Sequence, residues 1–381
     1  NQHITVIDQA DVAVIGGSMA GIASALRFAD AGKRVIILEQ RTYMGREITA
    51  TLRPWVPKES RLENLPEWLL LILQECQTGE VNGAGSSISM HPDRFKIALE
   101  DLLLEKGIRF LYGILPIELL MLNDRLDGVI VANKSGRQAI LCQTVMDATE
   151  TAIVSQLIGT PVSPSEDKGI YYRTMEFTGV QELGEMEMTS PTSLGLVADH
   201  ISFHQGVRGK DHIYVEFALL LPAGNDLQAD RERETIGRMS GMELAAHLIH
   251  NVASFGKANL AASSYELYGP FASVSKAFSV NESISISHWQ TQVPQAWSLY
   301  RDFYLHANEA WLDPLEAVRM GDHAAQLVLT AYSEAESTNI NIVSNEESHK
   351  NYTDQAIDTR SDVDTCSDYE VRIPSELSGR A

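Results

Sequence analysis

The sequence has few cysteines and no long apolar run, and both absences narrow its class. Its 381 residues include three cysteines, Cys76, Cys142 and Cys366, which form neither a CxxC pair nor a metal-binding spacing. The longest apolar run, residues 69–73, is far shorter than the roughly 18 to 20 residues that cross a bilayer, and no signal peptide is visible at the N-terminus. We therefore expect no membrane span, and the scattered cysteines favour the cytoplasm.

Cations are also scarce. The chain has 30 Lys and Arg against 51 Asp and Glu, which gives a net charge of −21. Such a field repels nucleic acid and anionic membrane surfaces, and no cluster of basic residues counters it. We expect no nucleic-acid partner, and any dinucleotide must be attracted by local geometry rather than by bulk charge.

The N-terminal segment has the pattern of a βαβ unit. Residues 11–15 are a β-branched apolar run typical of a buried strand, residues 22–31 predict a helix rich in small side chains, and residues 34–38 predict a second strand that ends at Glu39. A unit of roughly this length is the start of a Rossmann-type fold.

The turn between the first strand and the helix is Gly16-Gly17-Ser18-Met19-Ala20-Gly21. Gly16 permits a tight turn, and Gly21 lets the helix pack against the strand. Ser18 stands where the usual motif has glycine, but it is small and its hydroxyl adds a hydrogen-bonding group. The helix N-terminus offers N–H groups to a diphosphate, and the Glu39 carboxylate would accept hydrogen bonds from a ribose.

The rest of the chain predicts a mixed fold. An antiparallel pattern begins near residue 160, and a composition shift follows residue 332. The expected helices are 67–76, 92–106, 235–254, 294–310 and 314–332, and the expected strands are 108–112, 117–121, 126–132, 138–142, 144–147, 171–180, 212–221 and 284–288.

Residues 11–21 and 38–41 resemble the FAD-binding start of the glutathione-reductase-like flavoproteins. More narrowly, the chain resembles the FAD-dependent oxidoreductase family related to fumarate-reductase-type flavoproteins. Segment 43–51 resembles the family's glycine-pair loop along the flavin, segments 90–95 and 107–113 the elements leading to the adenine pocket, and segments 133–138 and 145–149 its hairpin and closing strand. The resemblance covers residues 10–161 and resumes at 319–325, where a Gly and an acid open the last helix in such proteins.

Two positions depart from the family pattern. Arg46 replaces the second glycine of the early loop, and Glu150 replaces the glycine of the closing strand, Asp147-Ala148-Thr149-Glu150. Arg46 would pair with a phosphate or with a carboxylate such as Glu47, whereas Glu150 would either crowd the cofactor or point away. The cofactor-binding residues that the motif and the resemblance imply are Ile15, Gly16, Gly17, Ser18, Met19, Ala20, Gly21, Glu39, Gln40, Arg41, Gly45, Arg46, Glu47, Ile114, Leu115, Ala148, Thr149, Glu150, Gly321 and Asp322.

We therefore expect an α/β protein in which a Rossmann-type FAD-binding domain carries an inserted α+β substrate domain. The FAD-binding domain would comprise residues 10–161 and 311–333, and the substrate or cap domain residues 162–310. Residues 334–381 contain eleven acids and four Lys or Arg. Because few apolar residues there could form a core, we expect an acidic, mobile C-terminal tail.

Catalytic groups are hard to find in this sequence. There is no nucleophile elbow, zinc motif or paired-carboxylate motif, so we expect no metal site and leave the catalytic acid or base unassigned. The remaining candidates, each also explained by packing or a surface position, are Arg53 and Trp55 after the flavin loop, His204 and Arg208 in a predicted surface loop, His288 and Trp289 at a strand end, His247 and His250 on a helix, and His323 beside Gly321.

Two function classes follow from this pattern. The first is an FAD-dependent oxidoreductase that moves hydride or electrons between a small organic substrate and flavin. The alternative is a non-catalytic or accessory subunit that keeps the fold and works with a partner chain or as a homo-oligomer. A plain NAD-binding dehydrogenase is a third reading, because the glycine motif and Glu39 alone do not separate the two cofactors.

Overall fold

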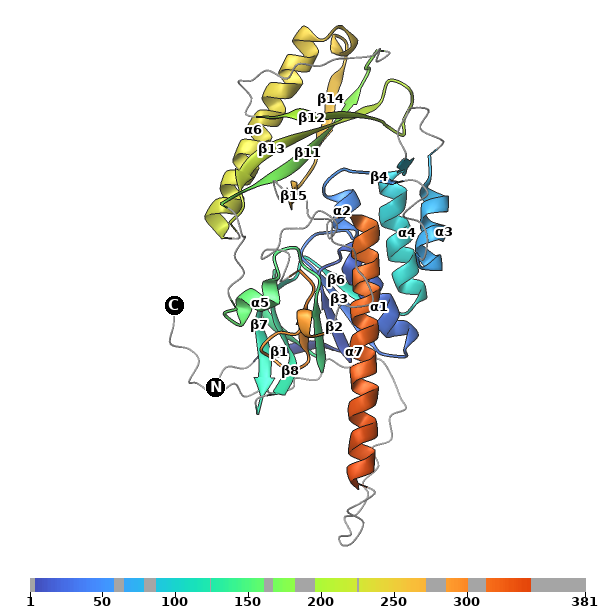
Figure 1. The fold of residues 1–381 in the computed structure, drawn as a ribbon, viewed down its shortest axis with the longest axis vertical. Coiled ribbons are helices and arrows are strands. Elements are labelled where there is room, and N and C mark those ends of the chain that lie inside the picture. Colours follow the sequence, from blue (N-terminus) through green and yellow to red (C-terminus); the bar gives the residue numbers. More distant parts are fainter. Residues whose placement is uncertain are drawn as a thin grey trace.

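The computed structural model describes residues 4–57, 65–78, 87–123, 125–160, 167–181, 196–224, 226–271, 286–300 and 313–343. The described elements form two units (Figure 1). The first contains a parallel sheet with helices beside it, and the second contains an antiparallel sheet with one long helix. The predicted α/β class with a Rossmann-type domain and a second domain is confirmed.

A five-stranded parallel sheet forms the centre of the first unit. Its order is β16-β10-β2-β3-β6, and every residue of β2, β3 and β10 is buried. Burial on both faces explains why β2 is apolar throughout and β3 is apolar up to its last residue, Glu39. The strands are β2 (Val12–Ile15), β3 (Val35–Glu39), β6 (Arg109–Tyr112), β10 (Thr144–Asp147) and β16 (Ala296–Ser298).

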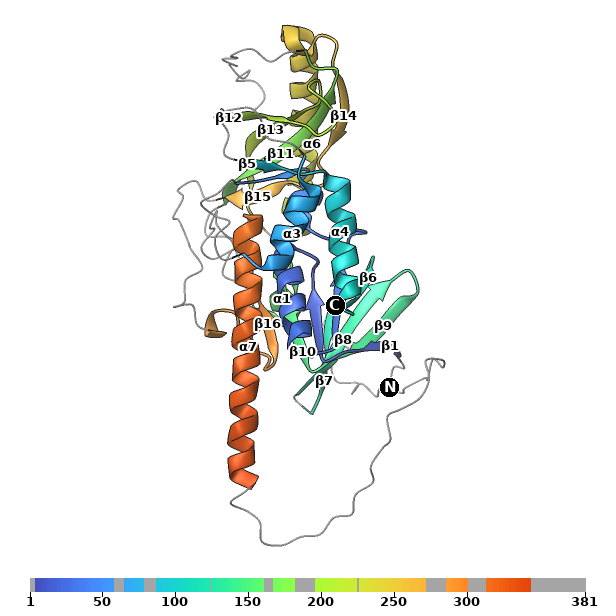
Figure 2. The same cartoon turned by 90° about the vertical axis from the view of Figure 1, so that its right-hand side faces the viewer.

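Helix α1 (Met19–Asp30) joins β2 to β3 and completes the predicted βαβ unit. The long helix α7 (Pro314–Val343) packs along α1 and extends past the body of the unit (Figures 1 and 2). The remaining elements near them are α2 (Arg46–Thr49), β4 (Trp55–Pro57), α3 (Glu67–Cys76), β5 (Ser87–Ser89) and α4 (Pro92–Glu105). The predicted helices at 67–76 and 92–106 are thereby confirmed to within one residue.

A four-stranded sheet in the order β1-β9-β8-β7 packs beside the parallel sheet (Figure 2). Its strands are β1 (Thr5–Gln9), β7 (Leu115–Leu122), β8 (Arg125–Asn133) and β9 (Gly136–Leu141), and α5 (Ile153–Leu157) contacts β7. Sequence reasoning found the hairpin but missed β1, which pairs in parallel with β9. The shared core of the two sheets contains Ile15, Ile36, Val129 and Ile140.

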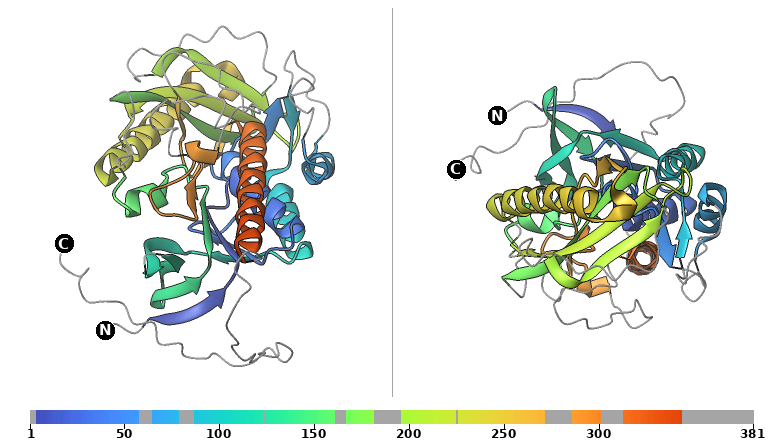
Figure 3. Two further views of the ribbon diagram at one scale, coloured as in Figure 1. Left: turned by 60° about the horizontal axis from the view of Figure 1, so that its bottom comes forward. Right: turned by 90° about the horizontal axis from the view of Figure 1, so that it is seen from above.

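The second unit is an antiparallel sheet in the order β12-β13-β11-β14, with β15 also paired to β11. Helix α6 lies across the sheet when the molecule is seen from above (Figure 3). Phe177, Phe217, Leu244 and Phe255 form the centre of its core. The elements are β11 (Lys168–Thr178), β12 (Leu196–Gln205), β13 (Ile213–Pro222), α6 (Leu227–Asn251), η2 (Ala253–Phe255), β14 (Asn259–Ser263) and β15 (Tyr268–Phe271).

Two predicted elements differ from the structure. The expected strand at 284–288 is a short 3-10 turn, η3 (Ile286–His288), within the described residues. The expected helix at 294–310 begins instead with β16, because Gln295 has a left-handed φ of 69° and the next three residues pair in parallel with β10. Residues 301–310 lie outside the described residues.

These differences also bear on the domain boundaries. We expected residues 162–310 to form the second domain, yet β16 belongs to the parallel sheet of the first unit. Helix α7 runs to Val343 and so includes the first ten residues assigned to the acidic tail. Residues 344–381 lie outside the described residues.

Candidate functional site

The N-terminus of α1 and the carboxyl end of β2 form a tight cradle. Gly16 has a φ of 95°, a conformation that favours glycine. Ser18 is the N-cap of α1: its hydroxyl accepts a hydrogen bond from the Gly21 N–H (3.2 Å) and donates one to the Ala148 carbonyl (2.8 Å). Serine therefore fills the place of the usual glycine by joining the helix start to the end of β10.

Carboxylates already accept hydrogen bonds from backbone N–H groups of this cradle. Glu39, at the end of β3, accepts one from Gly17 (2.5 Å) and one from Arg41 (2.7 Å). Glu47 accepts one from Met19 in the first turn of α1 (3.0 Å). Both carboxylates are at most 2% exposed. The helix N-terminus that would attract a diphosphate therefore has an internal acidic neighbour.

Arg46 and Glu150, the two departures from the family pattern, face each other. The Arg46 Nε lies 3.4 Å from a Glu150 oxygen and 2.8 Å from a Glu266 oxygen. Arg41 lies beside the same two carboxylates, with its Nη2 2.5 Å from Glu150 and 2.9 Å from Glu266. We call Arg41, Arg46, Glu150 and Glu266 the ion network. Arg46 therefore pairs with Glu150 and Glu266 rather than with its neighbour Glu47, and Glu150 points into the site.

The ion network shifts the proton affinities of its members. Burial raises the pKa of Glu150, but Arg41 and Arg46 outweigh it and hold that pKa at about 2. Burial likewise opposes the charge of Arg46, yet Glu150 and Glu266 keep its pKa above the usual value. Burial raises the pKa of Glu47. Arg41, Arg46 and Glu150 are therefore charged at neutral pH.

Most of the other predicted cofactor residues surround the same edge. Ile114 donates its backbone N–H to the Glu39 carbonyl (3.2 Å), which places Ile114 and Leu115 beside the end of β3. Gly45 donates to the Gly17 carbonyl (2.7 Å). Ile15, Ala20, Gln40, Ala148 and Thr149 also lie in or directly after the elements that end here.

Gly321 and Asp322 are an exception, and their predicted place at the opening of the last helix is wrong. They lie seven and eight residues after Pro314, the first residue of α7. A Cβ at Gly321 would come 2.0 Å from the Ala20 carbonyl oxygen, so this glycine lets α7 approach α1 closely. Asp322 pairs with Arg27 at 2.7 Å. These residues join two helices.

A cavity of about 560 Å³ opens above the ion network, between the two units. The first unit contributes the segment from Gln40 to Tyr43, Arg46, Glu150 and Thr151, and the second contributes residues of β11, α6 and the β14–β15 turn. Four arginines and four acids line it, the arginines being Arg41, Arg46, Arg233 and Arg238. In a chain of net charge −21, this wall is locally neutral and suits an anion better than the average surface.

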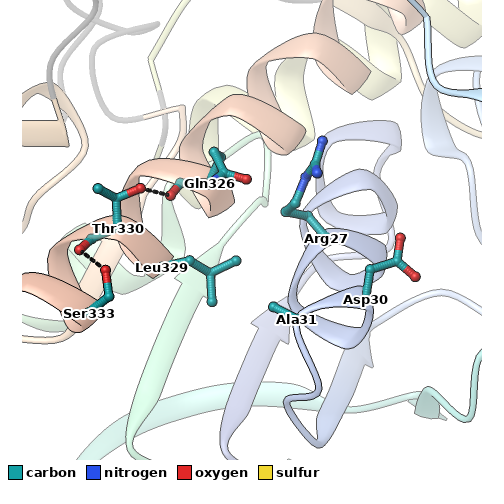
Figure 4. A pocket seen from close by; sticks show the side chains of 7 residues that line it. All are labelled: Arg27, Asp30, Ala31, Gln326, Leu329, Thr330 and Ser333. Carbon is teal, nitrogen blue, oxygen red and sulfur yellow. Dashed lines mark hydrogen bonds between the residues drawn. The ribbon is translucent and has the colours of Figure 1, made fainter. Parts of the chain in front are cut away.

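A second depression, of about 360 Å³, lies between α1 and α7 (Figure 4). Arg27, Asp30 and Ala31 of α1 face Leu329 and Thr330 of α7 across it. It is at the C-terminal end of α1, away from the cradle, so we do not assign it to the site. Within the described ranges, no group of three or more His, Cys, Asp or Glu is arranged to hold a metal ion. None of the helices described is both long enough and apolar enough for a membrane span.

Arg53, Trp55 and His204 meet at the boundary of the two units. The rings of Trp55 and His204 stack with centroids 3.9 Å apart. Arg53 forms an ion pair with the buried Glu216 of β13 and lies over the Tyr268 ring, 4.0 Å from its centroid. Sequence reasoning placed His204 in a surface loop, but it belongs to β12, which pairs with β13.

His204 is a neutral base at this boundary. Burial lowers its pKa, and its Nε2 is buried with no hydrogen-bond partner among the residues that the structure describes. His323 also has a buried Nε2 without a hydrogen-bond partner among the described residues, and it packs edge-on against Trp289, whereas His247 and His250 bond within α6. Of these, His204 is the one that lies at the contact between the two units, stacked on Trp55.

Sequence reasoning missed several members of the site. Glu266 comes from a turn of the second unit whose backbone N–H bonds to the Ala50 carbonyl (3.1 Å), and no motif marks it. Tyr300 approaches Glu47 (3.5 Å) from a segment that we expected to be helical. Asp147 accepts hydrogen bonds from Thr149, Val154 and Ser298. Only its position at a strand end would have pointed to it.

The residues present fit the diphosphate and ribose of a dinucleotide. The cradle supplies a helix N-terminus, Glu39 supplies an acceptor at the end of β3, and Arg41 and Arg46 line the adjoining cavity as cations. The carboxylates of Glu39, Glu47, Glu150 and Glu266 already accept hydrogen bonds from some of the same backbone N–H and arginine donors.

Comparisons with known proteins agree with this geometry. The model of the family described as FAD dependent oxidoreductase matches residues 11–212, more than half of the chain. No curated protein matches the sequence significantly.

Among solved structures, the chain is similar to a geranylgeranyl bacteriochlorophyll reductase-like protein from Thermoplasma acidophilum, with 13% identity, a TM-score of 0.54, and 86% of this chain and 80% of that chain covered. It is also similar to NikD, described as an unusual amino acid oxidase essential for nikkomycin biosynthesis, with 14% identity, a TM-score of 0.52, and 84% and 94% covered. At these identities the likeness shows a shared fold. With the family match over residues 11–212, the chain belongs to the FAD-dependent oxidoreductase family.

Proposed function

We propose that this protein is an FAD-dependent oxidoreductase that moves hydride or electrons between a small organic substrate and flavin. The observation that carries the proposal is the cavity of about 560 Å³ at the carboxyl ends of the parallel strands, lined by Arg41 and Arg46, in a chain of this family. Open α/β sheets bind ligands at that edge. FAD, when bound, supplies the redox chemistry.

Different residues of the chain would contact different parts of the cofactor. The first turn of α1 and the two arginines would hold the diphosphate, and Glu39 would accept hydrogen bonds from a ribose. Ser18 would keep the helix N-terminus in place, since its hydroxyl ties that turn to Ala148 (2.8 Å). Ile114 and Leu115, beside the end of β3, would contact the adenine side.

We place the substrate at the boundary between the units, beside Arg53, Trp55 and His204. Trp55 begins β4, shortly after the helix α2 that contains Arg46, and His204 comes from the facing sheet. A neutral imidazole with an unpartnered, buried Nε2 suits the transfer of a proton to or from a substrate. Arg53 would keep the two units aligned through Glu216.

The test uses the purified full chain. Added to FAD at equilibrium, the protein should change the flavin fluorescence and absorbance, and the flavin should bleach anaerobically when a substrate from a panel of small amines, alcohols and hydroxy acids is added. A folded protein that changes neither signal at concentrations up to the millimolar range would refute the proposal. A protein that binds FAD but whose flavin no substrate bleaches would leave FAD binding standing and remove the proposed turnover.

One observation favours a second candidate, a non-catalytic subunit that works with a partner chain or as a homo-oligomer. Glu47 bonds to Met19 of the cradle, and Glu150 holds both arginines. These internal carboxylates already neutralise the cations and accept from the N–H group that the cofactor's diphosphate would otherwise use. Size-exclusion chromatography with light scattering separates the candidates, because a monomer with full activity excludes an obligate accessory role.

We also propose that the protein is cytoplasmic. Cys76 and Cys142 are free and buried, and burial raises their thiol pKa values to about 11 and about 12. Unreactive free thiols of this kind suit a reducing compartment. Cell fractionation tests this, and recovery outside the cytoplasm would contradict it.

A further inference from the structure

The ion network lies in the wall of the cavity where an anionic ligand would bind. Arg41 and Arg46 are 13% and 6% exposed in their side chains, and both line the cavity. Both arginines pair with Glu150 and with Glu266, and Arg41 also pairs with Glu39. The cations that would bind a diphosphate are thus committed to internal partners.

Glu150 differs from the other two carboxylates in its position. Glu39 also bonds to backbone N–H groups of Gly17 and Arg41, and Glu266 comes from the second unit, where its backbone is tied to Ala50. Glu150 and Glu266 both line the cavity and contact both arginines, but Glu150 lies on the same unit as the arginines, just after β10. A ligand entering the cavity therefore meets Glu150 as a like charge placed directly on its binding partners.

We propose that Glu150 is an internal competitor for the diphosphate, so that its contacts with Arg41 and Arg46 set how tightly this chain holds a dinucleotide. The inference rests on the proposed function and extends that function by naming the residue that determines cofactor affinity. Like charges a few ångströms apart in a buried site repel strongly, and a charged acceptor on an arginine must be displaced before a phosphate oxygen can use the same N–H groups.

The consequence is weak and exchangeable binding of FAD. Removing the charge of Glu150 would leave the cavity wall with one more cation than acid and would free donor capacity on Arg41 and Arg46. Glu266 and Glu39 would still hold the arginines in place. The structure of the site would then persist while its affinity for an anion rises.

The experiment measures the dissociation constants of FAD and of ADP by isothermal titration calorimetry at pH 7.5. The proteins are the full wild-type chain, Glu150→Gln, Glu150→Ala and the control Asp11→Asn. Asp11 also pairs with an arginine, Arg34, at 2.7 Å, but at the amino ends of the strands. Each variant raises the net charge by one unit, so the control removes the effect of overall charge. Circular dichroism and thermal melting confirm that each protein is folded.

We expect Glu150→Gln to bind both FAD and ADP about tenfold more tightly than the wild type, and Glu150→Ala to change in the same direction. Asp11→Asn should differ from the wild type by less than about twofold. Equal FAD affinity in all four proteins, or the same gain in Asp11→Asn, would overturn this inference and leave FAD binding intact. A gain for FAD without a gain for ADP would also overturn it, because the effect would then lie on the flavin side. Failure of all four proteins to bind FAD would refute the proposed function itself.

Discussion

Replacing Arg46 should reveal how much the ion network contributes to folding. The Arg46 side chain is 6% exposed, and its Nε lies 2.8 Å from Glu266 and 3.4 Å from Glu150. Breaking a buried ion pair by removing one partner costs about 3–5 kcal/mol, because the other charge is left uncompensated. Arg41 still contacts both carboxylates, so we expect Arg46→Met to lower the free energy of unfolding by about 3 kcal/mol, the lower end of that range.

A double-mutant cycle with Glu150→Gln isolates the contact between the two substituted positions. At 3.4 Å and an effective dielectric constant of about 20, the gross attraction is about 5 kcal/mol. Glu150 is 24% exposed and shares its charge between two arginines, so solvent and competition reduce this value. We expect a coupling free energy of about 1–2 kcal/mol.

The assay is urea denaturation at pH 7, followed by circular dichroism and tryptophan fluorescence so that separate unfolding of the two units is detected. Asp11→Asn serves as the control, because a partly exposed pair should contribute less than about 1 kcal/mol. If the free energy of unfolding of Arg46→Met is within about 1 kcal/mol of the wild-type value, or if the coupling free energy is near zero, then Arg46 and Glu150 do not stabilise each other and the reasoning is refuted.

Three further outcomes follow from the same structure. The stability advantage of the wild type over Glu150→Gln should be full above pH 4.5 and shrink as the pH falls toward 2, because the network holds the pKa of Glu150 at about 2 in the folded state. Urea denaturation at pH 3 and at pH 6 checks this, and a stability advantage that grows in acid would contradict it. Arg53→Met should destabilise the protein by about 3 kcal/mol or more, because it leaves the buried Glu216 carboxylate without its cation. Adding Glu216→Gln should restore part of the lost stability, and two additive losses would argue against the ion pair. His204→Ala should leave the FAD dissociation constant unchanged and lower kcat at least tenfold if His204 transfers a proton; full turnover would remove it from the mechanism.

The parallel sheet and its cradle could be predicted from the sequence because their determinants are local. The strands β2 and β3 are short, mainly apolar runs that are buried on both faces, and Ser18 precedes the first helical residue as its N-cap. The segment 294–300 was misread for the opposite reason. Its apolar residues suit a helix or a buried strand, and only pairing with β10, far away in the sequence, decides between them.

The charged part of the site could not be predicted because its partners are distant. Arg41 and Glu150 are 109 residues apart, and Arg46 and Glu266 are 220 residues apart. The resemblance marked Arg46 and Glu150 as unusual, but it did not indicate that one substitution compensates the other. His204 was among the candidate residues but was placed in a surface loop, because the strand that contains it is defined by its pairing with β13.

The identity of the bound dinucleotide tests the central claim most directly. The chain would be dialysed to equilibrium against an equimolar mixture of FAD, NAD and NADP, and the compounds in excess over the dialysate quantified by mass spectrometry. The site predicts FAD, approaching one molecule per chain at saturating concentration, with more bound to Glu150→Gln than to the wild type below saturation. Binding of NAD or NADP in place of FAD, or of no dinucleotide by either protein, would contradict the account.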